Sequence, residues 1–154
     1  MRALTLFFML FSFSYADQYT FLMDKYDKEI ELEAKILFKI ATVSTRGDIT
    51  LFIPEMTPVE AKVYGKFFTL TPDCQGANFV FVNKTTTDTI PCNASGKLFF
   101  TNNYKKLLSD RKFFGAFFWA KSRPNIVFLK NRLAVQNITL PQAYDHYTEE
   151  LDVP

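Results

Sequence analysis

The stretch KFFGAFFWAKSRPNIVFLKN, from Lys112 to Asn131, decides the fold of this chain. It contains two apolar runs, separated by the polar, turn-forming residues 121–124. Both runs are rich in aromatic and β-branched residues, the composition typical of strands. Apolar residues occupy consecutive rather than alternate positions, so both faces of each strand should be covered by other parts of the protein. We therefore predict a β-hairpin that is buried on both faces.

Other segments predict further strands and helices around this hairpin. Strand-like composition occurs at residues 48–53, 66–70, 77–82 and 97–101, and helical patterns occur at residues 19–44, 57–64, 103–108, 131–136 and from Leu140 onward. This order of segments is typical of a mixed α/β or α+β domain. We predict a single sheet of about five to six strands flanked by helices, with a C-terminal β-hairpin and a terminal helix.

Local signals predict where two of the helices begin or end. Thr57 supplies a capping hydroxyl, Pro58 suits the first helical position, and Glu60 stands three residues after the cap. Gly47 lies just beyond the helix at 19–44, where a left-handed residue can end it. Within that helix the apolar residues form one stripe, and we expect the charged residues to occupy the opposite face.

Residues 1–16 have the features of a cleaved signal peptide. Arg2 gives a basic start, residues 3–14 are almost all apolar, and SYA at residues 14–16 has the small-x-small pattern read before cleavage. The alternative, a transmembrane anchor, needs about twenty apolar residues, which is more than this run offers. We predict an exported chain in which residues 17–154 form a single domain.

Cys74 and Cys92 are the two cysteines, and both follow the export signal. Disulfides persist in the compartments that such signals lead to, so we predict a bond between them. Closing a loop of that length stabilises a fold by about 3 kcal/mol. The alternatives are weaker, because His146 is the one histidine that could complete a zinc site and no CxxC spacing indicates redox catalysis.

No pattern in the sequence indicates catalysis. A hydrolase of nucleophilic type needs a nucleophile beside a base, and the single histidine, His146, belongs to the charged terminal helix. The five glycines are scattered, whereas phosphate-binding loops need them clustered. Lys plus Arg number 18 against 16 Asp plus Glu, a balance that argues against a nucleic-acid partner. We predict no enzymatic activity, no cofactor and no metal.

Three Asn-x-Ser/Thr sequons are present, at Asn83, Asn93 and Asn137. In a eukaryotic secretory protein they could carry glycans. The residues leave open whether they are ever modified.

Several stretches resemble the YfiR-like group of small exported bacterial proteins. They are ELEAKILFKI at residues 31–40, CQGANFVFV at residues 74–82, FFWAKSRPNIVF at residues 117–128, and ITLP at residues 138–141. The resemblance implies a periplasmic α/β module. It also implies a function, in which the module restrains a membrane-bound diguanylate cyclase by binding its periplasmic sensor part.

Our leading hypothesis from the sequence is a periplasmic, non-enzymatic module that acts by protein-protein contact. Candidate interface residues are the aromatics and the arginine near the ends of predicted elements, since these residue types anchor interfaces: Tyr104, Trp119, Arg123 and Tyr144. Two alternatives stay open. One is a small-solute or lipid binder with an aromatic-lined cavity, and the other is a structural subunit of a cell-envelope assembly.

Overall fold

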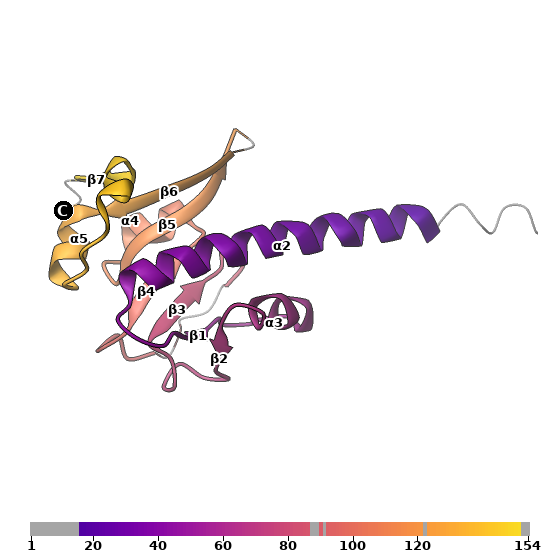
Figure 1. The fold of residues 1–154 in the computed structure, drawn as a ribbon, viewed down its shortest axis with the longest axis horizontal. Coiled ribbons are helices and arrows are strands. Elements are labelled where there is room, and N and C mark those ends of the chain that lie inside the picture. The colour runs from indigo at the N-terminus through magenta and orange to yellow at the C-terminus, as the bar shows by residue number, and fades with distance from the viewer. Residues whose placement is uncertain (1–15, 87–89, 91, 122, 152–154) are drawn as a thin grey trace, which may run out of the picture.

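The computed structural model describes residues 16–86, 90, 92–121 and 123–151, with side chains from Tyr26 onward. The predicted signal peptide therefore lies outside the described residues, apart from Ala16, the first residue of the first helix. Figure 1 shows one sheet with helices on both sides and a long N-terminal helix that extends past the sheet. The predicted class, a single sheet flanked by helices, is confirmed.

Within the described residues, seven strands form one sheet in the order β2-β1-β3-β4-β5-β6-β7. The strands are β1 (Thr50–Phe52), β2 (Thr69–Leu70), β3 (Phe79–Val82), β4 (Leu98–Thr101), β5 (Phe113–Ala120), β6 (Arg123–Leu129) and β7 (Thr148–Glu149). The first five in this order run parallel, β6 is antiparallel to β5, and β7 is parallel to β6. The predicted hairpin is thus β5 and β6. Arg123 and Pro124, which the sequence places in the turn, belong to β6 because they pair with Ala120 and Trp119, and Ser122 lies outside the described residues.

The sheet differs from the prediction at its two edges. The expected strand at 66–70 is shortened to β2, because the backbone N–H groups at 66–68 donate to carbonyls at the end of the preceding helix. The expected terminal helix is a 3-10 helix, η1 (Gln142–Tyr147), followed by β7. β7 pairs with Phe128 and Leu129, since the free edge of β6 offers unpaired backbone groups. This pairing is why the sheet exceeds five to six strands.

The α-helices are α2 (Ala16–Ser44), α3 (Pro58–Tyr64), α4 (Tyr104–Ser109) and α5 (Lys130–Val135). The predicted capping box of Thr57 and Glu60 is present at the start of α3, with Pro58 as its first residue. Gly47 has a φ of 92°, the left-handed conformation expected just past α2. Local sequence signals therefore account for these two helix ends.

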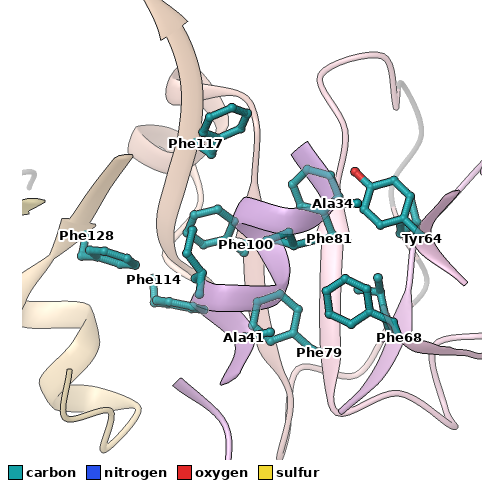
Figure 2. Packing of buried hydrophobic residues seen from close by; sticks show 14 of the residues in the cluster. Ala34, Ala41, Tyr64, Phe68, Phe79, Phe81, Phe100, Phe114, Phe117 and Phe128 are labelled. Carbon is teal, nitrogen blue, oxygen red and sulfur yellow. The ribbon is translucent and has the colours of Figure 1, made fainter. Parts of the chain in front are cut away.

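Side chains on the α2 side of the sheet form the larger core cluster. Figure 2 shows phenylalanine rings of the sheet gathered beneath α2, with Ala34 and Ala41 of the helix above them. Both alanines are fully buried, so the helix lies close to the rings. Each fully buried Phe contributes about 1.5–3 kcal/mol, which makes these rings the main source of stability.

A second, smaller cluster covers the opposite face of the sheet. It is built from Val80, Val82, Phe99 and Phe113 of the strands with Leu107 of α4, and the disulfide segment lies at its border. Since successive residues of a strand point to opposite faces, the runs FVFV and FF supply both clusters at once. The predicted burial of the hairpin on both faces is confirmed for residues 113–117 and 127–129.

Candidate functional site

A pocket of about 600 Å³ lies at one edge of the sheet. Glu55 follows β1, Asn83 follows β3, and Asn102 follows β4, while Trp119 stands near the end of β5. These strands are parallel, so their carboxyl ends meet at this edge. Open α/β sheets bind ligands at that same place. We refer to this hollow as the carboxyl-edge pocket.

A chain of hydrogen bonds forms the floor of the carboxyl-edge pocket. The hydroxyl of Tyr64 in α3 donates to Oε1 of Glu33 in α2 over 2.7 Å. Nδ2 of Asn102 donates to the other oxygen of Glu33 at 3.1 Å and also approaches Oδ1 of Asn83 at 3.3 Å. Three elements, α2, α3 and the end of β4, are therefore joined through one carboxylate.

The chain of bonds continues to the start of α3. Asn83 is only 7% exposed, and its Nδ2 donates to Oε1 of Glu60 at 3.2 Å. The other oxygen of Glu60 accepts from the backbone N–H of Thr57 at 2.7 Å. Glu60 thus completes the capping box of Thr57 and also lines the pocket, and these bonds hold its carboxylate in place.

The electrostatics of the floor follow from burial. Burial raises the pKa of Glu33, and the hydrogen bonds from Tyr64 and Asn102 oppose that rise because they favour the ionised form. Burial, followed by the charge of Glu33, also raises the pKa of Tyr64 far above its ordinary value. Tyr64 therefore keeps its proton at neutral pH and can donate a hydrogen bond to Glu33.

Two half-exposed aromatic side chains stand at the rim. Tyr26 of α2 and Trp119 of β5 are each 48% exposed, and both line the pocket. Trp119 meets the buried ring of Phe117 at 5.9 Å in an edge-to-face arrangement. This contact packs the indole against a buried ring of the same strand, while about half of Trp119 stays exposed.

The four predicted interface residues do not form one surface. Trp119 and Arg123 both lie near the tip of the hairpin, but Trp119 pairs with Pro124 and Arg123 pairs with Ala120, so their side chains leave opposite faces of the hairpin. Tyr104 lies on the α4 side of the sheet, with its ring 5.1 Å from that of Phe118. Tyr144 belongs to η1 and packs on the core against Phe128, at the opposite end of β6.

The predicted disulfide between Cys74 and Cys92 is present. Their Cα atoms are 5.7 Å apart, within the usual range for a bridge. The bond ties the segment after β3, which the sequence predicts to be a loop or short helix, to the loop before β3. Residues 87–89 and 91 of that segment lie outside the described residues, and its remaining residues contain no helix or strand.

Sequence reasoning missed the floor of the carboxyl-edge pocket. The charge pattern predicts a solvated Glu33, yet this residue lies between the buried residues Ile30 and Leu37 of α2. Glu33 stands three residues after Ile30 and four before Leu37, which places it on the same face of the helix as these core residues. This spacing is the signal that could have predicted its burial. Asn83 and Asn102 each follow a buried strand directly, and such polar residues at the ends of parallel strands are the second signal.

Two absences concern the described residues alone. These residues contain no group of three or more His, Cys, Asp or Glu placed to hold a metal ion. None of their helices has the length and apolar character that crossing a membrane requires.

Comparison of the chain with models of protein families, with curated proteins and with solved structures found no match. The resemblance to the YfiR-like group therefore stays a prediction.

Proposed function

We propose that this chain is an exported, non-enzymatic protein-binding module of the bacterial periplasm. In this proposal it contacts a membrane-bound signalling protein, such as a diguanylate cyclase, and restrains it. The observation that supports the proposal best is Trp119, which lies half exposed near the hairpin tip and lines the carboxyl-edge pocket.

Trp and Arg are the residue types that most often anchor protein interfaces. Here both lie on a paired strand, in a ladder that runs from Gly115–Phe128 to Ala120–Arg123. Binding therefore needs little ordering of the backbone at these two positions, and the cost of association is lower. A hairpin tip that projects beyond the body of the sheet can reach a partner without disturbing the core (Figure 1).

The disulfide and the predicted signal peptide support the proposed compartment, because disulfides persist in the periplasm. The resemblance to the YfiR-like group supports a signalling partner in the membrane. The mechanism would be occupancy, in which the bound module stabilises one conformation of the partner by its differential affinity for it.

The test is site-specific photocrosslinking in intact cells that produce the full-length chain. A photoreactive residue replaces Ala120, the exposed neighbour of Trp119 at the hairpin tip, or, as a matched control, Val135, which is 82% exposed on α5. We expect a crosslink from position 120 to one membrane protein and none from position 135. Trp119→Ala should weaken affinity for the captured protein by about 30-fold, the loss of an interface anchor.

A second candidate function has its own supporting observation, the pocket volume of about 600 Å³, which is in the usual range for small-ligand sites. Native mass spectrometry of the purified protein distinguishes the two. A stoichiometric small molecule, together with no crosslinked protein, would favour the solute or lipid binder. Fixed-stoichiometry recovery in a large envelope assembly would favour the structural subunit instead.

A further inference from the structure

The carboxyl-edge pocket has an excess of negative charge. Four carboxylates line it, from Glu29, Glu33, Glu55 and Glu60, and among its described lining residues only Lys84 carries an ammonium group. Glu55 holds a left-handed backbone with a φ of 55°, a conformation that costs a non-glycine residue energy. Strain of this kind is concentrated at binding sites, and here it lies in the wall of the pocket.

Glu33 has unused capacity to accept hydrogen bonds. A carboxylate offers about four lone-pair positions, and the bonds from Tyr64 and Asn102 use one position on each oxygen. Those two bonds hold the carboxylate in one orientation within a partly desolvated site. A cation that reaches it is attracted more strongly than at an exposed carboxylate, because water screens the interaction less.

The rim adds a second recognition element for a cation. The half-exposed rings of Tyr26 and Trp119 line the same pocket as the carboxylates. The face of an aromatic ring attracts an ammonium or guanidinium group within about 6 Å, most strongly in the case of Trp. Carboxylates at the floor with aromatic rings at the rim suit a flat or compact cation on an apolar stem.

We propose that the carboxyl-edge pocket binds a lysine ammonium or arginine guanidinium group presented by the protein partner. The proposal rests on the proposed function and specifies the chemistry of the partner at this site. The basic side chain passes between Tyr26 and Trp119 and donates to Glu33 and Glu60. Lys84 opposes binding, so its removal strengthens the interaction.

The test uses the purified protein and two small probes. N-acetyl-arginine amide carries the guanidinium group, and N-acetyl-citrulline amide is its neutral isostere. Binding is followed by NMR chemical-shift changes of the Asn83 and Asn102 side-chain amides and of the Trp119 indole. We expect the arginine probe to shift these signals in a saturable way and the citrulline probe to leave them unchanged.

Variants are expected to change the affinity for the arginine probe in both directions. A tighter affinity cannot result from damage to the fold. Glu33→Gln should weaken binding of the arginine probe about tenfold, since a hydrogen bond to a charged group is lost. Trp119→Leu, which leaves the floor intact, should weaken it about threefold. Lys84→Met should tighten it about threefold. Glu31→Gln is the matched control, because this exposed residue of α2 pairs with Lys35 and should leave binding unchanged.

Equal binding of the citrulline probe, or an unchanged affinity in both Glu33→Gln and Lys84→Met, would overturn the proposal. Its failure is distinct from failure of the proposed function, because crosslinking from the hairpin tip can still capture a partner when the pocket ignores cations. If a free amine copurifies in the pocket and no partner is captured, the partner's side chain is excluded as the occupant and the proposal is overturned.

Discussion

At the residue scale, Arg132 is the charged side chain with the most demanding environment. It is 7% exposed, and its guanidinium donates to backbone carbonyls at the end of α4 and the start of β5. The acceptors are Leu107, Leu108 at 3.4 Å, Asp110 at 2.9 Å and Phe113 at 2.9 Å. Desolvation lowers the pKa of Arg132, but the guanidinium stays protonated because its ordinary value is so high.

Replacing Arg132 by Met should therefore destabilise the protein strongly. The carbonyls of α4 would stay buried without donors, and we expect a loss of about 3 kcal/mol in the free energy of unfolding. Urea denaturation followed by circular dichroism measures it. Arg123→Met is the matched control, since that exposed arginine lies at the hairpin tip and should change stability by less than about 0.5 kcal/mol. Similar losses in the two variants would contradict the role assigned to Arg132.

At the element scale, β5 contains an irregularity that depends on one glycine. The register shifts between the pairs Phe99–Phe113 and Phe100–Gly115, which leaves Phe114 as an extra residue, as in a β-bulge. A Cβ at Gly115 would lie 2.7 Å from the carbonyl oxygen of Val127 and 2.8 Å from the rings of Phe100 and Phe128. The absent side chain is what lets these rings close over the strand.

Gly115→Ala should cost about 1–3 kcal/mol, the usual range for overpacking a core. The backbone oxygen of Val127 cannot move without disturbing the β5–β6 ladder, so relaxation is limited. Gly76→Ala is the control, because its nearest neighbour is a Thr71 side chain at 3.3 Å. A thermal melt of both variants tests this, and a stability for Gly115→Ala equal to that of the wild type would contradict it.

The segment between β3 and β4 is held by the Cys74–Cys92 bond, with a sequence separation of 18. Its removal in a double Cys-to-Ser variant should lower the free energy of unfolding by about 3 kcal/mol, because the unfolded chain regains loop entropy. Adding a reductant to the wild type should reproduce this loss and should leave the double variant unchanged. A reductant effect of the same size in the double variant would mean that another cause is responsible.

At the scale of the whole molecule, the carboxylate of Glu33 in α2 joins that helix to α3 and to the end of β4 through hydrogen bonds. Because burial raises its pKa in the folded state, the folded protein holds the Glu33 proton more tightly than the unfolded chain. The contribution of this proton to stability is therefore complete below the pKa of Glu33 in the unfolded chain. It is lost as the pH rises through the higher pKa of the folded state.

The raised pKa of Glu33 predicts the direction in which Glu33→Gln changes the pH dependence of stability. The neutral amide keeps a donor and an acceptor for Tyr64 and Asn102, so the variant should gain stability relative to the wild type as pH rises, and then reach a plateau. Urea unfolding across the pH range measures the difference. Glu31→Gln should show the opposite trend, because its bond with Lys35 lowers the pKa of Glu31. A pH-independent difference for Glu33→Gln would contradict a raised pKa in the folded protein.

Much of the fold could be predicted because its signals are local. The run from Phe113 to Leu129 marks the hairpin, and the Thr57 cap marks α3, without reference to any distant residue. The length of the terminal elements could not be predicted in this way. Thr148 favours a strand but Glu149 does not, and two residues are too few to predict a strand. They form β7 because the edge of β6 is available to pair with them.

The candidate site could be predicted only in part. Residue type near an element end singles out Trp119 and Arg123, and both lie near the hairpin tip, although the strand register directs them to opposite faces. The same criterion singles out Tyr104 and Tyr144, but they lie on the other face and at the other end of the sheet. Residue type can be read from a single position. A prediction that several residues share one surface also requires the order and direction of the strands in the sheet.

The sequence by itself determined the class of the fold, the buried hairpin, the helix caps and the pairing of the two cysteines. Each of these follows from composition, from spacing or from the presence of a single possible partner. Only the tertiary structure decided that Glu33, Asn83 and Asn102 form one hydrogen-bonded floor. These three residues come from segments far apart in the chain. Asn83 and Asn102 meet because β3 and β4 are parallel neighbours in the sheet, which brings the carboxyl ends of the two strands to the same edge.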